Sequence, residues 1–370
     1  GLLLPGACLT PPPPPPQAHD TEASRVKAPG PAPDKKVVPI VFCSNDAYVP
    51  YMSAAIQSIM EHAGTNYCYH LYVLHQNISP GYKSKIDKQV SKFTGFKIDF
   101  IDATEHIRSF TFTNLNYSIA AYFRLLIPYI FEDYSQVIYL DCDIICLADI
   151  AKLIEISAGE CLLNGVRDFG IISPRRGKGH AQMLGLRNHK NYFNSGVLVI
   201  NTREFRENVS KNELLDMASK KSFPFPEQDT LNVVCEGRVH YLPMAWNVMD
   251  YVKIKNIPRG LRKEHGEALK KESIIHYVWD KPWKQITDSK RYTVFWEYAE
   301  RTPFVDSIYA EIGKSVSTQS IKIDGQKIYG DIRRGSSLGI KFIVRCGIVW
   351  MVYKLKKLLP VQGAGARTLP

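Results

Sequence analysis

From Val37 onward, short runs of β-branched and aromatic residues alternate with stretches whose apolar residues have helical spacing. The first part of this pattern contains the predicted strands VVPIVFC (37–43), CYHLYVL (68–74) and FKIDFI (96–101), with predicted helices at 52–62 and 80–93 between them. Strands that alternate with helices form right-handed βαβ units, which build a parallel sheet covered by helices. This alternation therefore predicts an α/β fold.

The same alternation continues through the second half of the chain. A helix around residues 120–130 leads into the strand SQVIYL (135–140), and further strands are expected at 161–166 and 195–201. Helical patterns follow at 202–220 and 228–236. The chain has 370 residues, of which 45% are hydrophobic, so it can bury the core of one large domain. We expect this main domain to span residues 37–300.

The two ends of the chain differ in composition from the middle. Residues 1–36 include PPPPPPQAHD and PAPDKK, and so Pro-rich a stretch predicts an extended, disordered linker. Residues 301–370 are expected to form a C-terminal extension. Within it, residues 340–359 read IKFIVRCGIVWMVYKLKKLL, whose uncharged run from Cys346 to Tyr353 is shorter than the roughly 20 apolar residues that a bilayer span needs.

Aromatic and basic side chains occur together in that C-terminal segment. Trp350 and Tyr353 stand beside lysines at positions 354, 356 and 357. Aromatic rings favour the membrane interface and ammonium groups favour anionic lipid, so this basic amphipathic tail predicts peripheral attachment to an anionic membrane surface. A helix packed against the main domain is the alternative. We expect a cytoplasmic protein, peripheral on the inner face of the membrane.

The chain is basic, with a formal net charge of +11, which favours anionic partners such as phosphorylated substrates, nucleic acid or acidic lipid. Nucleic acid is not expected, because the sequence contains no zinc-finger spacing, helix-turn-helix pattern or aromatic RNA-binding motif. The eight cysteines are scattered without C-x-x-C pairs, which predicts reduced thiols and a reducing compartment. The basic loop 174–178 has two interpretations, a solvated insertion or a lid over an anionic acceptor.

Two acidic residues follow the strand SQVIYL, in the stretch YLDCDIIC. Side chains alternate in direction along an extended strand, so Asp141 and Asp143 point to one side and Cys142 to the other. The carboxyl ends of parallel strands line the ligand crevice of an open sheet. Two carboxylates held together need a cation or a proton between them. Oxygen ligands suit Mg²⁺ or Mn²⁺ shared with phosphate oxygens.

Two other interpretations of this acidic pair stay open. Short acidic pairs at strand ends are often caps or the starts of solvated loops. A phosphohydrolase of the haloacid dehalogenase type also places an aspartyl nucleophile after an apolar strand, and that nucleophile would be Asp141. Such enzymes usually have Thr or Val where Ile145 stands, and the sequence shows no convincing downstream acidic pair for their metal.

Further motifs accompany the acidic pair in a fixed order. They read VFCSNDAY (41–48), AAYFRLLIP, YLDCD, NYFNSGVLVIN, PEQDTLN, LPMAWNVM and IIHYVWDKPW. This ordered set, over about residues 37–300, resembles the family-8 retaining glycosyltransferases, especially bacterial lipopolysaccharide galactosyl- and glucosyltransferases. The resemblance implies a Rossmann-like nucleotide-sugar transferase fold of the GT-A type, and makes residues 37–300 the catalytic domain.

The resemblance also implies roles for individual residues. Tyr48 would stack on uracil, while Arg124 and Lys281 would hold the diphosphate and the sugar. The implied metal ligands, for Mn²⁺ or Mg²⁺, are Asp141, Asp143 and His276. The implied catalytic residues are Gln228, Asp168 and Glu227. The residues implied to bind the nucleotide sugar are Cys43, Asn45, Ala47, Tyr48, Arg124, Asp141, Cys142, Asn194 and Lys281.

The implied function is metal-dependent transfer of glucose or galactose from UDP-glucose or UDP-galactose to a glycan or glycolipid acceptor, such as a lipopolysaccharide core, with an α linkage. UDP leaves as a stabilised anion, so the metal and Lys281 would stabilise its charge and no strong general acid is needed. Retention would follow from front-face attack or from a covalent intermediate. An amide is a poor nucleophile, so we favour front-face attack with Gln228 in a positioning role. A catalytically inactive membrane-bound scaffold of the same fold is the alternative.

Three departures distinguish the sequence from the family pattern. Asn45 stands where Asp is frequent near uracil, and Glu227 replaces the first Asp of D-Q-D. His276 and Lys281 are one residue closer than in H-x-x-G-x-x-K-P-W, and Trp279 occupies about the place of the Gly. We therefore expect the base contact, the sugar pocket and the closing loop to differ in detail from the family pattern.

Overall fold

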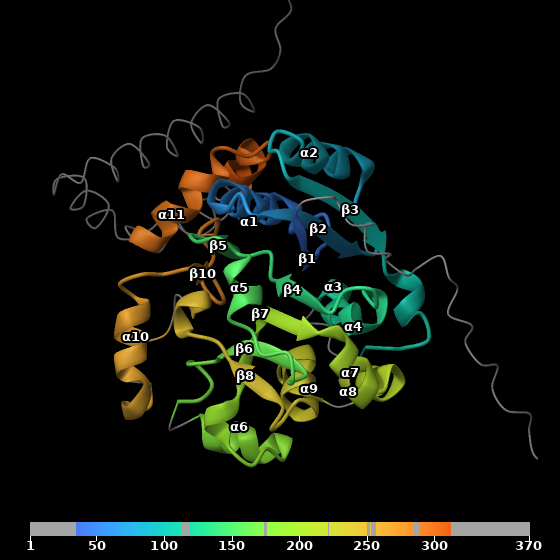
Figure 1. Ribbon diagram of the computed structural model, residues 1–370, viewed down its shortest axis with the longest axis vertical. Coiled ribbons are helices and arrows are strands. Elements are labelled where there is room, and N and C mark those ends of the chain that lie inside the picture. The colour runs from blue at the N-terminus through green and yellow to red at the C-terminus, as the bar shows by residue number, and fades with distance from the viewer. Residues whose placement is uncertain are drawn as a thin grey trace, which may run out of the picture.

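The computed structural model describes residues 35–112, 118–173, 176–220, 222–249, 252, 257–284 and 289–311. The larger of its two sheets has seven strands in the order β3-β2-β1-β4-β7-β6-β8 (Figure 1). These strands are β1 (Lys36–Cys43), β2 (Tyr67–His75), β3 (Phe96–Asp102), β4 (Gln136–Leu140), β6 (Leu163–Arg167), β7 (Phe193–Asn201) and β8 (Val239–Tyr241).

Most neighbouring strands of this sheet run in parallel. β1 pairs in parallel with both β2 and β4, β2 pairs in parallel with β3, and β6 pairs in parallel with β8. β7 is antiparallel to both of its neighbours, β4 and β6. The prediction of an α/β fold with a mainly parallel central sheet flanked by helices is therefore confirmed.

Helices cover both faces of the sheet (Figure 1). One face carries α1 (Val49–His62), α2 (Pro80–Val90) and α11 (Lys290–Ala299). The other face carries α3 (Ile119–Tyr122), α4 (Ile127–Ile130), α7 (Thr202–Asn208), α8 (Lys211–Lys220) and α9 (Pro226–Val234). Three further helices are α5 (Lys152–Glu155), α6 (Gly177–Leu184) and α10 (Arg262–Ala268).

Alternating side chains of each central strand enter two different cores. In β1, Ile40 and Phe42 pack with the helices of the first face, while Val41 and Cys43 pack with those of the second. This period of two is expected for a strand covered on both sides. Fully burying an apolar side chain such as Phe42 stabilises the fold by about 1.5–3 kcal/mol. The sheet is thus held from both faces, and the ends of its strands are left to form a site.

A second, smaller sheet brings the C-terminal part of the domain to the end of β4. Its order is β5-β10-β9, with β5 (Ile144–Cys146), β10 (Ile274–His276) and β9 (Val248–Met249). β10 is antiparallel to β5, and His276 pairs with Ile144. This pairing places His276 beside the residue that directly follows Asp143, and so beside the acidic pair.

The helix predicted around residues 120–130 is broken into three short pieces. α3 ends at Tyr122, a 3₁₀ turn spans Phe123–Leu126, and α4 begins at Ile127. Pro128 lies in the first turn of α4. It has no N–H to donate to the carbonyl four residues earlier, that of Arg124, so one continuous α-helix is disfavoured. Arg124 therefore lies on a tight turn that faces the sheet end.

The predictions for the two ends of the chain mostly fall outside the described residues. These include residues 1–34 of the predicted linker and the basic tail at 340–359. In the described part of the chain, no helix combines the length and the apolar character that a bilayer crossing requires. Phe304, Ile308 and Tyr309 are buried in the first core, so packed structure continues past Ala299. The domain bounds 37–300 and 301–370 stay predictions.

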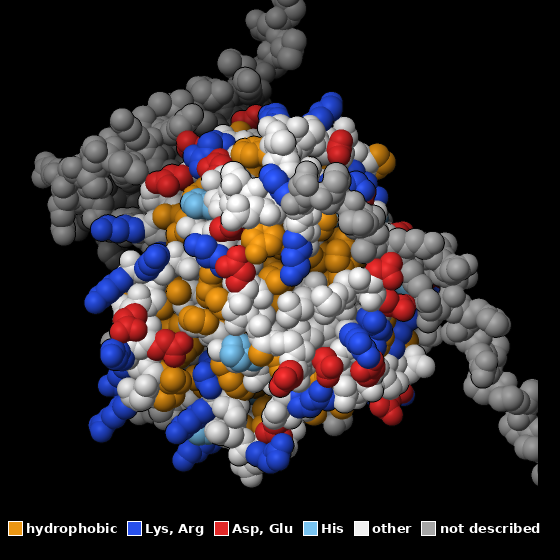
Figure 2. Space-filling model, in the orientation of Figure 1, with side chains coloured by type: hydrophobic (Ala, Val, Ile, Leu, Met, Phe, Trp, Pro, Cys, Tyr) orange, Lys and Arg blue, Asp and Glu red, His pale blue; other side chains and the backbone are white. Residues whose placement is uncertain are grey.

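The net positive charge does not form one continuous basic surface on the face shown in Figure 2. Lys and Arg side chains are spread over this face with Asp and Glu side chains among them, and hydrophobic side chains lie between them. Opposite charges placed near one another reduce the field that an anionic partner would meet from that side.

Candidate active site

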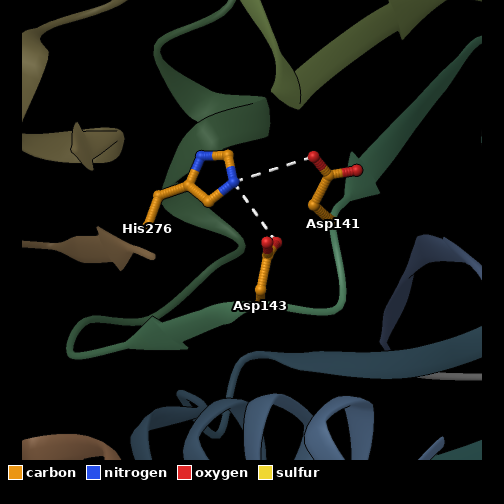
Figure 3. Close-up of side chains that lie close together, drawn as sticks. All are labelled: Asp141, Asp143 and His276. Atoms are coloured by element: carbon orange, nitrogen blue, oxygen red, sulfur yellow. Dashed lines mark ion pairs between the residues drawn. The ribbon is translucent and has the colours of Figure 1, made fainter. Parts of the chain in front are cut away.

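The acidic pair and one histidine converge where β4 meets the smaller sheet. Asp141 follows the last residue of β4 and Asp143 precedes β5, while His276 ends β10. The Nε2 atom of His276 lies 3.7 Å from Oδ2 of Asp141 and 3.3 Å from Oδ1 of Asp143 (Figure 3). The three ligand atoms lie within 4.8 Å of one another. The three predicted metal ligands are therefore brought together.

Cys142 points away from this cluster, as the alternation of side chains predicts. Its thiol donates to the carbonyl oxygen of Cys43 at 3.3 Å and is buried in the wall of the site. Burial raises the pKa of the Cys142 thiol well above its ordinary value. Cys142 thus supplies packing and a backbone contact here, and its uncharged thiol does not add a third negative group to the acidic pair.

Each carboxylate of the pair has a cationic partner of its own. Arg124 Nη2 lies 3.0 Å from Oδ1 of Asp141, and Lys281 Nζ donates to Oδ2 of Asp143. Burial favours the neutral form of Asp143, but Lys281 and His276 outweigh it and hold the pKa of Asp143 below its ordinary range. The opposite oxygens, Oδ2 of Asp141 and Oδ1 of Asp143, face His276. One oxygen of each carboxylate therefore stays directed at the centre of the cluster.

Arg124 is fixed by several acceptors besides Asp141. Its Nε donates to the carbonyl of Ala121 at 3.0 Å, and its Nη1 donates to the carbonyl and the hydroxyl of Ser195 at 3.1 and 2.9 Å. The guanidinium also lies 4.8 Å from the centre of the Tyr139 ring. Burial disfavours its charge, but Asp141 outweighs burial, so the pKa of Arg124 is raised and the guanidinium stays charged.

Hydrogen bonds determine which nitrogen of His276 faces the carboxylates. The backbone N–H of Gly196 donates to the side-chain oxygen of Asn194 at 2.9 Å. The side chain of Asn247 also contacts this Asn194 oxygen, at 2.9 Å, and the contacting atom must be the Asn247 amide nitrogen because an oxygen there could not donate. The other end of the Asn247 amide, its oxygen, then faces Nδ1 of His276 at 2.9 Å. Nδ1 of His276 therefore carries the proton that is donated to Asn247, and Nε2 is the nitrogen that would present a lone pair to the centre of the cluster in the neutral imidazole.

The absence of a side chain at Gly196 makes room for this cluster. A Cβ atom built at Gly196 would lie 2.6 Å from Oδ2 of Asp141 and would also collide with the His276 ring. The backbone carbonyl of Gly196 accepts from the backbone N–H of Asp141 at 2.8 Å. β7 therefore cannot move away from Asp141 without losing this hydrogen bond. Glycine at this position is therefore required by the close approach of β7 to the two ligands.

This arrangement fits a divalent metal ion. Two carboxylate oxygens and one imidazole nitrogen lie around one centre, and this donor set suits Mn²⁺ or a similar ion. Asn247 orients the imidazole as the partners of metal-bound histidines commonly do. Lys281 and Arg124 each occupy the carboxylate oxygen that faces away from this centre.

A cavity of about 380 Å³ opens on one side of the cluster. It is lined by Cys43, Ser44, Asn45, Tyr48, Ser118, Ala120, Ala121, Arg124, Tyr139, Asp141, Cys142, Asp143 and Glu227. Tyr48 is 39% exposed at the edge of this cavity, and its ring and the Tyr51 ring make a T-shaped contact. Ala47 is exposed in the turn after β1 and is not among the described residues that line this cavity.

A second cavity, of about 200 Å³, opens on the other side of the cluster. It is lined by Arg124, Asp141, Asp143, Asp168, Ile171, Asn194, Ser195, Phe225, Glu227, Gln228, His276, Val278 and Trp279. Arg124, Asp141, Asp143 and Glu227 line both cavities. The two spaces therefore meet at the acidic pair.

Gln228 has both ends of its amide engaged in the second cavity. Its oxygen accepts from the backbone N–H of Ser195 at 2.9 Å, which identifies it as the oxygen. Its nitrogen donates to Oδ2 of Asp168 at 3.2 Å and to the hydroxyl of Tyr192 at 3.1 Å. Asn194 also donates to Oδ2 of Asp168 at 3.2 Å. Gln228 and Asp168, the implied catalytic residues, and Asn194, implied to bind the nucleotide sugar, therefore form one hydrogen-bonded group.

Glu227 carries a buried oxygen atom without a hydrogen-bond partner among the described residues. Its Oε1 lies 3.8 Å from Nη2 of Arg124, while its Oε2 has no partner. Burial raises the pKa of Glu227, and the charge of Arg124 only partly opposes this effect. A buried polar atom of this kind is costly unless a ligand or water satisfies it. Its position between the two cavities points to a polar ligand group.

The helix that carries Gln228 is tied to the basic segment at residues 176–178. α6 begins at Gly177, and its His180 Nε2 lies 2.7 Å from Oδ1 of Asp229, the residue after Gln228. Arg176 and Lys178 are exposed, whereas Pro174 and Arg175 lie outside the described residues. This contact joins α6 to α9, the helix that carries Gln228 at the second cavity.

Several lining residues were not expected from the sequence. These are Ser44, Ser118, Ala120, Ala121 and Tyr139 in the first cavity, and Ile171, Ser195, Phe225, Val278 and Trp279 in the second. Asn247, which orients His276, was also missed. Three of these residues, Ser195, Asn247 and Trp279, stand inside the motifs FNSGV, WNVM and HYVWDKPW. Their place in these motifs was therefore a sequence signal that they lie near the site. Lys281 lies against Asp143 and is not among the described residues that line either cavity.

A family model described as glycosyl transferase family 8 matches residues 39–287, which is more than half of the chain. General stress protein A of Bacillus subtilis (strain 168) is 25% identical over 279 residues, covering 72% of this chain and 94% of that protein. Lipopolysaccharide 1,2-glucosyltransferase of Escherichia coli (strain K12) is 27% identical over 173 residues, covering 45% of this chain and 50% of that protein.

The solved apo structure of the bifunctional glycosyltransferase WbbM superposes with a TM-score of 0.67 at 28% identity. The match covers 77% of this chain and 53% of the WbbM chain, so this chain spans about half of that protein. The GT-A type of fold that the motifs imply is confirmed by this likeness.

Replacing Gly196 with Ala should weaken Mn²⁺ binding at least tenfold, because the added methyl group would displace Asp141 and His276. We expect the same change to lower the free energy of unfolding by about 1–3 kcal/mol. Gly81→Ala is the matched control, since a Cβ there meets nothing within 4 Å. Mn²⁺ titration followed by electron paramagnetic resonance gives the affinity of both variants. Equal affinities would contradict the close approach of β7 to the ligands.

Replacing Asn247 with Ala should weaken Mn²⁺ affinity by about 10- to 100-fold, because His276 loses the partner that orients its ring. Asn164→Ala is a control for lost stability, since Asn164 is equally buried but bonds only to the backbone around Ala158 and Val199. Both variants should unfold at lower temperature. Only Asn247→Ala should lose metal affinity, and a similar loss in Asn164→Ala would reduce the role of Asn247 to general stability.

Proposed function

The chain belongs to glycosyl transferase family 8, and from this membership we propose that it is a metal-dependent retaining hexosyltransferase. It moves glucose or galactose from a UDP-sugar to a glycan or glycolipid acceptor, such as a lipopolysaccharide core, and forms an α linkage. The observation that carries this proposal is the meeting of two cavities at the acidic pair. A nucleotide sugar has the same order of parts, with a diphosphate between a nucleoside and a hexose.

The nucleoside half of the donor fits the larger cavity. The exposed Tyr48 ring can stack on uracil, and the Asn45 side chain lies beside Tyr48, donating to Ser118 Oγ at 2.9 Å. The diphosphate then reaches the cluster, where Asp141, Asp143 and His276 would hold Mn²⁺. Bound there, this ion supplies Lewis-acid stabilisation of the charge on the departing diphosphate.

The hexose half of the donor fits the smaller cavity. Asp168, Asn194 and Gln228 form its hydrogen-bonded wall, and the unpaired Oε2 of Glu227 can accept from a sugar hydroxyl. Arg124 contacts both Asp141 and Glu227, so it lies at the junction of the diphosphate and the sugar. Its fixed guanidinium can stabilise negative charge there without reorganising during the reaction.

The hydrogen bonds of Gln228 favour a positioning role over a nucleophilic one. Its oxygen accepts from the backbone N–H of Ser195, which lowers its availability for attack, and an amide oxygen is a weak nucleophile. In front-face attack, the acceptor oxygen forms the new bond to the anomeric carbon as the bond to the phosphate oxygen of UDP breaks. The acceptor proton passes to that departing phosphate oxygen, and the α configuration is retained.

The two alternative functions have less support. Membership of a glycosyltransferase family argues against a phosphohydrolase that uses Asp141 as its nucleophile. An inactive scaffold would not need the oriented imidazole or the paired cations at the acidic pair. We also propose, from the sequence alone, that the basic tail at 340–359 holds the enzyme on the anionic inner face of the membrane.

Asp141→Asn and Asp143→Asn should each lower donor hydrolysis at least about 100-fold, because each removes a charged ligand of the proposed ion. UDP release from UDP-glucose and UDP-galactose, with and without Mn²⁺, measures this loss. Asp99→Asn is the control, since Asp99 also contacts a histidine, His70 at 2.6 Å, but lies on β3. Thermal unfolding should stay cooperative in all three variants. Full Mn²⁺-dependent hydrolysis in both site variants would refute the proposed metal site.

Glu227→Asp should change the ratio of UDP-glucose to UDP-galactose hydrolysis more than it changes UDP affinity. The shorter side chain withdraws a buried carboxylate from the sugar cavity by one methylene, while the nucleoside cavity keeps its other lining residues. Steady-state hydrolysis of both donors and calorimetric titration of UDP separate the two effects. An unchanged donor ratio together with weaker UDP binding would place Glu227 away from the sugar.

A further inference from the structure

Trp279 is an exposed aromatic residue at the sugar cavity. Its side chain is 57% exposed, the largest fraction among the exposed large apolar side chains that the structure describes. It nevertheless lines the smaller cavity, as do its neighbour Val278 and the polar residues Asp168 and Gln228. A residue that is both exposed and cavity-lining lies at the mouth of that cavity.

The turn that carries Trp279 is held at both ends. On one side, the backbone N–H of Tyr277 donates to the carbonyl of Asp143 at 2.9 Å, directly after His276. On the other side, Lys281 Nζ donates to Asp143 and to the carbonyls of Tyr277 and Val278. The peptide positions on either side of Trp279 are therefore anchored to the acidic pair. More than half of Trp279 is exposed to solvent on this turn.

An indole at this position matches the chemistry of a sugar ring. A pyranose has hydroxyl groups at its edge and C–H groups on its faces, so it binds best between polar groups and a flat apolar surface. The polar wall suits the donor hexose, and the small cavity has little space beyond one ring. A second sugar ring approaching the anomeric carbon from outside would pass the mouth of the cavity, where Trp279 lies.

We propose that Trp279 is the stacking surface of an acceptor-sugar subsite. The inference rests on the proposed function and extends it to the acceptor, whose terminal unit is identified as a pyranose with an apolar face. Trp279 takes no part in bond breaking. It raises the occupancy of the acceptor and orients its hydroxyl toward the donor hexose.

Comparing donor hydrolysis with sugar transfer tests this subsite. The purified full chain is assayed with Mn²⁺ and one donor, UDP-glucose or UDP-galactose, to measure hydrolysis. The assay is then repeated with an acceptor saccharide to measure transfer. The acceptors are lactose, maltose, octyl β-glucoside and octyl β-galactoside, the last two below their micellar concentrations. In Trp279→Ala, transfer relative to hydrolysis should fall about tenfold through a higher KM for the acceptor. Trp279→Phe should recover most of this ratio. Met183→Ala, which removes an exposed apolar side chain on α6, is the control and should keep the wild-type ratio.

Indole fluorescence gives a second readout that does not depend on turnover. Titrating the same saccharides into wild-type protein with UDP and Mn²⁺ should change the emission and protect it from acrylamide, and Trp279→Phe should abolish this change. The subsite is overturned if Trp279→Ala has the same ratio of transfer to hydrolysis as the wild type. It is also overturned if the saccharides still change the fluorescence of Trp279→Phe. If the wild type hydrolyses neither donor, the proposed function fails, and the fluorescence titration alone then decides for or against the saccharide subsite. Emission that responds to anionic vesicles and to no saccharide assigns the ring to lipid and refutes the proposal.

Discussion

Two carboxylates that lie close together and largely out of water repel each other, and the organisation of this site follows from how the chain offsets that repulsion. Arg124 pairs with Asp141 and Lys281 pairs with Asp143, so each acid has a cation before any ion binds. The two cations come from segments far apart in the sequence, the 3₁₀ turn before α4 and the loop after β10. Removing one partner of a buried pair typically costs about 3–5 kcal/mol. Charge compensation therefore joins these segments to the end of β4.

β7 has a larger part in the site than its single predicted ligand-binding residue suggests. Asn194 and the Gly196 backbone together determine how Asn247 and then His276 are oriented. Ser195, between them, contacts both Arg124 and Gln228. β7 runs antiparallel to β4, so its N-terminal residues lie at the end where β4 delivers Asp141. One antiparallel strand in a mainly parallel sheet thus links the cluster of Asp141, Asp143 and His276 to the smaller cavity.

The sequence predicted the parts of this molecule that follow from local patterns. Alternation predicted the strands and the common direction of Asp141 and Asp143, and the ordered motifs predicted that His276 would join them. The break at Pro128, the pairing of Arg124 with Asp141 and the tautomer of His276 depend on contacts between distant segments, which a local pattern does not contain. Ala47 was expected near the nucleotide but is exposed in the turn after β1, because loop geometry decides which of several adjacent residues faces a cavity.

The antiparallel pairing of β5 with β10 has a consequence for the time at which the site forms. β5 and the acidic pair are synthesised long before His276, which must pair with Ile144 to complete the cluster. Contacts between residues that are far apart in the sequence form late in folding, because a long loop has to close before these contacts stabilise the chain. On the ribosome, the N-terminal half can build β1 to β4 while its acidic pair still lacks the imidazole. A nascent chain would therefore complete the cluster of Asp141, Asp143 and His276 only after the C-terminal part of the domain has emerged.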